Sequence, residues 1–81
     1  MLISVEISYY PLNEEYKKPI LSFIDSLKQN QKLIVRTNTM ATQVFGEFDE
    51  VMSSVSACIK GAFELPHSVF VIKVINADLR D

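Results

Sequence analysis

Two kinds of hydrophobic periodicity alternate along this chain, and their order constrains the fold more than any other feature. Residues 2–10 alternate apolar and polar side chains and are rich in β-branched residues, which predicts a half-buried strand. Residues 19–30 begin at Pro19, which suits the first turn of a helix, and then repeat apolar residues at helical spacing. Residues 33–37 and 42–47 are short strand-like runs joined by residues 38–41, the expected hairpin connection.

The second half of the chain repeats this pattern. Residues 48–64 return to helical spacing, with Asp49 and Glu50 near the expected N-terminus, and residues 68–76 are a strand rich in Val and Ile. The order βαββαβ predicts an α+β, ferredoxin-like domain with a four-stranded antiparallel sheet. Both helices should cover one face of that sheet and leave the other face open.

Length and composition limit the possible classes of protein. A chain of 81 residues predicts a single domain, residues 1–81. A net charge of −2 argues against binding to nucleic acid, which needs a basic surface. One cysteine excludes a disulfide framework, and the longest apolar run, Val69–Ile72, is too short to span a membrane. With no signal-peptide pattern at the start, we expect a cytoplasmic protein.

Strand parity predicts which residues lie on the open face. Ile3, Val5 and Ile7 should contact the helices, as should Phe70, Ile72 and Val74 in the last strand. The opposite face then carries an apolar set consisting of Ile34, Phe45, Val69, Val71 and Ile75. A monomer does not readily expose such a patch, so we expect a homo-oligomer, a dimer or tetramer, that associates through the sheet.

Glu6 and the threonine-rich hairpin are the candidate site. Glu6 lies mid-strand, where it can pair with Lys73 across the sheet or accept a hydrogen bond from a ligand. The run "RTNTMATQVFGE", residues 36–47, has the turn and strand preferences of an ordinary hairpin. It can also form a polar rim around Met40, which would press on a flat ring.

Catalytic and metal-binding functions find little support in the sequence. Cys58 is expected to be a small buried hydrophobic residue, and His67 has no second His or Cys near it for a metal site. No residue is placed to break a bond. We therefore expect no enzyme, no cofactor and no metal.

Three stretches resemble the small YkoF-like thiamine-binding family: "SVEISYYPL" (Ser4–Leu12), "RTNTMATQVFGEFDEVM" (Arg36–Met52) and "VFVIKV" (Val69–Val74). They match in order and spacing over nearly the whole chain. The resemblance implies a ferredoxin-like fold, association through the sheets, and non-catalytic binding of thiamine or its hydroxymethylpyrimidine part. Thr39 is a departure, since family members often carry glycine beside the methionine.

The resemblance gives the candidate residues possible roles toward thiamine. Glu6 would accept a hydrogen bond from the amino group, while Met40 and Phe45 would cover the faces of the ring. Hydroxyl and amide groups that can donate or accept hydrogen bonds come from Ser8, Thr37, Asn38 and Thr42. The alternative is a self-associating interaction or regulatory module that has no small-molecule ligand.

Overall fold

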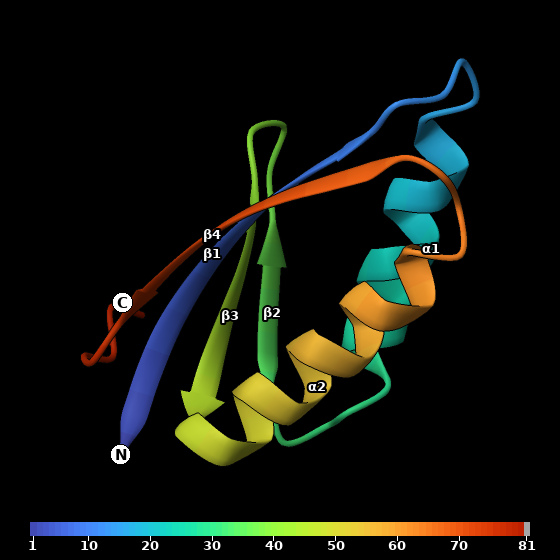
Figure 1. The fold of residues 1–81 in the computed structure, drawn as a ribbon. Helices are drawn as coiled ribbons and strands as arrows, with labels where there is room; N and C mark the ends of the chain where they lie inside the picture. Colours follow the sequence, from blue (N-terminus) through green and yellow to red (C-terminus); the bar gives the residue numbers. More distant parts are fainter. Residues whose placement is uncertain (81) are drawn as a thin grey trace.

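The computed structural model describes residues 1–80 and confirms the predicted ferredoxin-like architecture (Figure 1). The elements follow the expected order: β1 (Leu2–Pro11), α1 (Lys17–Lys28), β2 (Ile34–Thr37), β3 (Thr42–Glu47), α2 (Phe48–Ala62) and β4 (Ser68–Ile75). Helix α1 begins two residues earlier than predicted, so Pro19 still lies in the first turn, where its missing N–H costs no hydrogen bond.

The strands form one antiparallel sheet in the order β2-β3-β1-β4, with both helices on the same face (Figure 1). The register places Val5 of β1 opposite Val44 of β3 and Val74 of β4, so these three side chains share the helix side of the sheet. Glu6, one residue further along, therefore points to the other face, as strand parity predicts.

The core lies between β1, β3 and the two helices. Its central side chains are at most 2% exposed, namely Ile3, Val5, Ile7, Leu27, Val44, Val51 and Val55. Gly46 of β3 permits close approach, because a Cβ atom there would lie 3.3 Å from both Leu33 and Val51. At the far end of β1, the rings of Tyr9 and Phe70 stack at 4.2 Å, and Tyr9 meets Phe23 edge-on.

Strand β4 is an edge strand that the helices cover at Phe70, whose ring packs on Phe23 of α1 as predicted, but not further along. Ile72 and Val74 point to the helix side, yet they are 38% and 48% exposed. The expectation that they contact the helices is wrong, because the helices pack over β1, β2 and β3. Val69, Val71 and Ile75 are exposed on the open face. An eight-residue strand with Lys73 as its single charge thus presents apolar side chains on both faces.

Neither helix within residues 1–80 is both long enough and apolar enough to cross a membrane.

Candidate functional site

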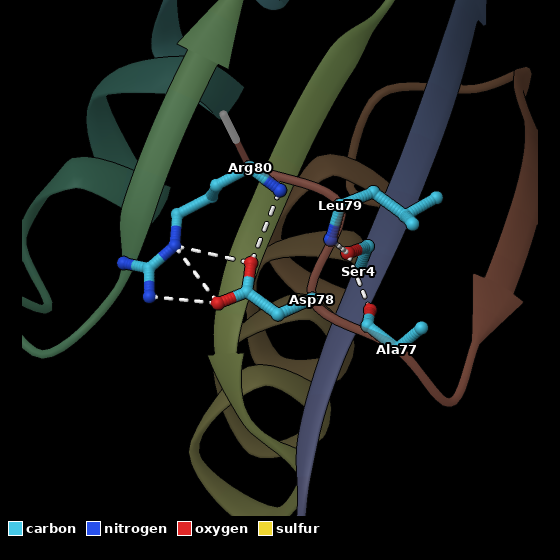
Figure 2. A network of polar contacts seen from close by, with 5 residues as sticks. All are labelled: Ser4, Ala77, Asp78, Leu79 and Arg80. Atoms are coloured by element: carbon cyan, nitrogen blue, oxygen red, sulfur yellow. Dashed lines mark hydrogen bonds and ion pairs between the residues drawn. The ribbon is translucent and has the colours of Figure 1, made fainter.

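The segment after β4 turns back over the open face of the sheet and is held there by Ser4 (Figure 2). The Ser4 hydroxyl donates a hydrogen bond to the Ala77 carbonyl at 2.7 Å and accepts one from the Leu79 N–H at 2.9 Å. These contacts leave Ser4 only 6% exposed. We call residues 76–80 the C-terminal strap.

Within the strap, Asp78 and Arg80 form a compact ion pair (Figure 2). The Arg80 Nε and Nη2 atoms donate to the Asp78 carboxylate at 3.1 and 2.8 Å, and the Arg80 backbone N–H donates to it as well. The hydrogen bonds from the Arg80 side chain, then from its backbone, hold the pKa of Asp78 below its ordinary value, and the nearby Arg36 charge adds to this.

Phe45 faces outward as predicted, but it is only 5% exposed. Its strand neighbours are Ser4 on β1 and Ile34 on β2, and the Arg36 guanidinium lies 5.5 Å from its ring centroid. Placing Phe45 in an exposed apolar patch is therefore wrong. Its ring instead supports the floor of the open face beside the strap.

Next to Phe45, the register aligns four polar residues in a row across all four strands. Arg36 lies opposite Gln43, Gln43 opposite Glu6, and Glu6 opposite Lys73. Lys73 Nζ lies 3.4 Å from Glu6 Oε1, so the expected cross-strand pair is present. Both side chains are well exposed, at 79% and 41%, and such a pair contributes at most about 1 kcal/mol.

This row and the strap border a hollow of about 370 Å³ on the open face. Phe45 and, from the strap, Leu79 also line this hollow. It thus combines one carboxylate, one amide, two cationic side chains and an aromatic ring. Such a set can hydrogen-bond the edge of a flat polar heterocycle, while the largely buried Phe45 ring supports the floor of the hollow.

The hairpin residues lie apart from this hollow. Asn38 Oδ1 accepts hydrogen bonds from the N–H groups of Met40 and Ala41, at 2.7 and 3.0 Å, and so shapes the turn itself. Met40 is 84% exposed in the loop between β2 and β3, and Figure 1 shows this loop at the end of the hairpin. Thr42 is opposite Ile7 on the helix side and is buried, while Thr37 pairs with Thr42.

Of the predicted site residues, the structure therefore brings Glu6 and Phe45 into one hollow. Ser8 is the next outward residue of β1, half-buried and opposite Val71. Sequence reasoning assigned no site role to Gln43, Arg36 or Leu79. Register could have identified the first two, since they share a row with Glu6, but no pattern predicts where Leu79 lies.

No metal centre is indicated, because residues 1–80 contain no group of three or more His, Cys, Asp or Glu side chains close enough to hold an ion.

The fold and the hollow define a small ferredoxin-like domain with a polar recess on its open sheet face. The chain belongs to the YkoF-related family, whose family model matches residues 3–76. This confirms the family resemblance seen in the sequence.

Solved structures agree with the fold. A hypothetical protein from Methanocaldococcus jannaschii is 22% identical with a TM-score of 0.83; the match covers 99% of this chain and 84% of that one. A Streptococcus pneumoniae protein is 21% identical with a TM-score of 0.85, covering 98% and 90%. A Thermotoga maritima protein, provisionally described as a thiamine biosynthesis/salvage protein, is 19% identical with a TM-score of 0.84, covering 95% and 85%. No curated protein matches the chain.

Proposed function

We propose that this protein binds thiamine or its hydroxymethylpyrimidine part, without catalysis, in the hollow on the open sheet face. The observation that carries the proposal is the placement of the Glu6 carboxylate beside the Gln43 amide, next to the Phe45 ring. Family membership and the provisional description of the Thermotoga maritima relative support it. The single cysteine, which leaves no disulfide framework, fits the reducing compartment of a cytoplasmic protein.

The groups of the hollow complement an aminopyrimidine. Its exocyclic amine is a donor that Glu6 can accept, and its ring nitrogens are acceptors that the Gln43 amide can serve. Glu6 can accept this hydrogen bond on its second oxygen while Lys73 stays at the first. Even complete release of Lys73 would cost at most about 1 kcal/mol, because an exposed pair of this kind contributes little. The hollow offers no activated nucleophile, and we propose no bond-breaking step.

We also propose that the protein acts as a homo-oligomer assembled through β4. An exposed apolar edge strand invites pairing with a second strand. Two copies can pair their β4 strands antiparallel with the helices of both copies on the same side of the joined sheet. Residues that face each other across this pair must then have numbers that are both even or both odd, because they point to the same face. A register with Ile72 opposite its own copy would place Val71 opposite Lys73, which keeps the two lysine charges apart.

Calorimetric titration with thiamine and with hydroxymethylpyrimidine tests the ligand. We expect saturable binding, weakened about tenfold or more in Glu6→Gln, which corresponds to ~1.4 kcal/mol. Glu14→Gln, an exposed carboxylate in the loop after β1, is the matched control and should bind as the wild type does. Absence of heat at millimolar ligand would defeat the proposal. Met40→Ala tests separately whether the exposed loop of the hairpin takes part, and unchanged thiamine binding would exclude that loop from the site.

Sedimentation velocity tests the assembly. We expect an oligomer at micromolar concentration and its dissociation by Val71→Lys, because the new charge lies on the uncovered strand. Leu21→Lys, which changes a 60% exposed residue on α1, is the control and should leave the oligomer intact. A clean wild-type monomer would refute the assembly. An oligomer that binds neither ligand would instead favour the alternative, a self-associating interaction module. The observation that supports this alternative is the exposure of the apolar side chains of β4.

A further inference from the structure

A second and larger hollow lies between α1 and α2, on the other side of the sheet from the polar row. Its volume is about 780 Å³. Its walls are the facing surfaces of the two helices, lined by Ser22 and Ser26 from α1 and by Ala57 and Gly61 from α2. Both pairs are four residues apart, so each contributes one continuous helix face. Tyr9 and Phe23 line its base.

Small residues on facing helices usually permit close contact, but here they border open space. The two helices are joined at the other end, where Asn30 Nδ2 donates to Glu50 Oε2 at 3.0 Å and to Ser54 Oγ at 2.8 Å. Toward the end of α2 the separation persists, since a Cβ atom built on Gly61 would meet no other atom within 4 Å. The Asn30 hydrogen bonds therefore tie the two helices together at one end, while Gly61 borders open space at the other.

The base of the hollow is a rigid aromatic surface. The Phe23 ring is 4% exposed and meets Tyr9 edge-on, with centroids 5.5 Å apart, while Tyr9 stacks on Phe70. The Tyr9 hydroxyl lies 3.2 Å from Ser68 Oγ, which fixes the ring in place. Phe23 thus supports the half-buried Tyr9 ring from within the core, and a flat apolar molecule can pack on the exposed part of Tyr9.

The rim of the hollow is charged, with an excess of negative charge. Glu15, Glu64 and Lys18 line it, and all three are exposed. No ion pair is recorded for either carboxylate within residues 1–80. A ligand with a positive or N–H-bearing edge would meet favourable charge at this rim.

We propose that the hollow between α1 and α2 is a binding site for a planar aromatic molecule that carries a cationic or N–H donor edge. Its volume falls in the range of about 300–1,000 Å³ that is usual for small-molecule sites. The ring lies on the exposed part of Tyr9 between the two helices, and its polar edge faces Glu15 and Glu64.

Proflavine, a planar three-ring cation, is a suitable probe, and anthracene-2-sulfonate is an anion of similar shape. Equilibrium dialysis should show saturable binding of proflavine, and binding of the sulfonate weaker by about threefold or more because of the acidic rim. No saturable proflavine binding would overturn the proposal. Equal or tighter binding of the sulfonate would overturn the assigned ligand class.

Gly61 provides a matched pair of variants. Gly61→Phe fills the hollow from a position with open space around it, whereas Gly61→Ala adds one methyl group at the same backbone site. We expect proflavine to bind Gly61→Phe about tenfold or more weakly and Gly61→Ala nearly as well as the wild type. Binding to Gly61→Phe at wild-type strength would overturn the proposal.

Cys58 gives a readout that needs no variant, because its half-buried thiol lines the same hollow. Burial raises the pKa of this thiol, so alkylation by iodoacetamide is followed at alkaline pH. Saturating proflavine should slow alkylation about threefold or more. An unchanged rate would show that the probe lies elsewhere and would overturn the assignment.

Thiamine titration of the same variants separates the two hollows. Thiamine binding that survives Gly61→Phe but weakens in Glu6→Gln supports the open-face site and leaves the proflavine result to decide the site between the helices. Thiamine binding lost in Gly61→Phe and retained in Glu6→Gln refutes the open-face location and supports the hollow between the helices.

Discussion

Removing the Ser4 hydroxyl should release the C-terminal strap. Ser4→Ala deletes the hydrogen bond to the Ala77 carbonyl and the one from the Leu79 N–H. Each such bond contributes about 0.5–1.5 kcal/mol net. Leu79 is 59% exposed, so the released backbone groups return to water, and we expect a total cost near the lower end, about 1–2 kcal/mol.

Two measurements follow this loss. Amide hydrogen exchange at Leu79 should accelerate about 5–30-fold, which is what 1–2 kcal/mol corresponds to. If the strap is part of the cooperative unit, the melting temperature should also fall, by about 4–8 °C per kcal/mol in a domain of this size. The control is Ser8→Ala, on the same face of β1, for which no side-chain hydrogen bond is recorded within residues 1–80. Unchanged exchange at Leu79, or equal effects of the two substitutions, would refute the reasoning.

Three further outcomes follow from local contacts. In urea unfolding, Gly61→Ala should raise the free energy of unfolding by about 0.5–1 kcal/mol, because Gly61 lies in an exposed part of α2. Gly46→Ala should lower the free energy of unfolding by about 1 kcal/mol or more, because the added Cβ would crowd Leu33 and Val51. Effects of the same sign would contradict this. Because the pKa of Asp78 is lowered, its pairing with Arg80 stabilises the strap fully above the ordinary carboxyl pKa of about 3.9, and this stabilisation is lost as the pH falls through the lowered pKa. NMR titration of the strap should show this transition, and Asp78→Asn should abolish the transition. Asn38→Ala should cost the hairpin about 1 kcal/mol and speed amide exchange at Ala41, and an unchanged rate there would count against the turn contacts.

The sequence predicted the parts of this fold that depend on periodicity. Alternation in β1 placed Val5 toward the helices and Glu6 away from them, and the register also delivers the predicted pairing of Glu6 with Lys73. Parity cannot say how far the helices extend across a sheet. For that reason parity places Ile72 on the correct face but does not predict that the helices leave it exposed.

The candidate site was only partly predictable for a related reason. Ser4 reads as a solvent-facing hydroxyl in a strand, and the strap that buries it has no repeating pattern. Likewise Met40 and Thr42 are close in sequence but diverge in space, since one is exposed in the loop and the other faces the helices. The hollow between α1 and α2 depends on the distance between two helices, which no local pattern encodes.

The central position of β1 also bears on how this domain folds. The hairpin of β2 and β3 joins neighbouring segments, such as Thr37 with Thr42, and can form early. By contrast, β1 must find β4 across nearly the whole chain, where Ser4 lies opposite Ile75. Closing so large a loop has an entropic cost that must be met before the core contacts repay it. We therefore expect docking of β4 onto β1 to set the rate of folding. Because the β2–β3 hairpin forms before this step, substitutions in the hairpin should change mainly the rate of folding.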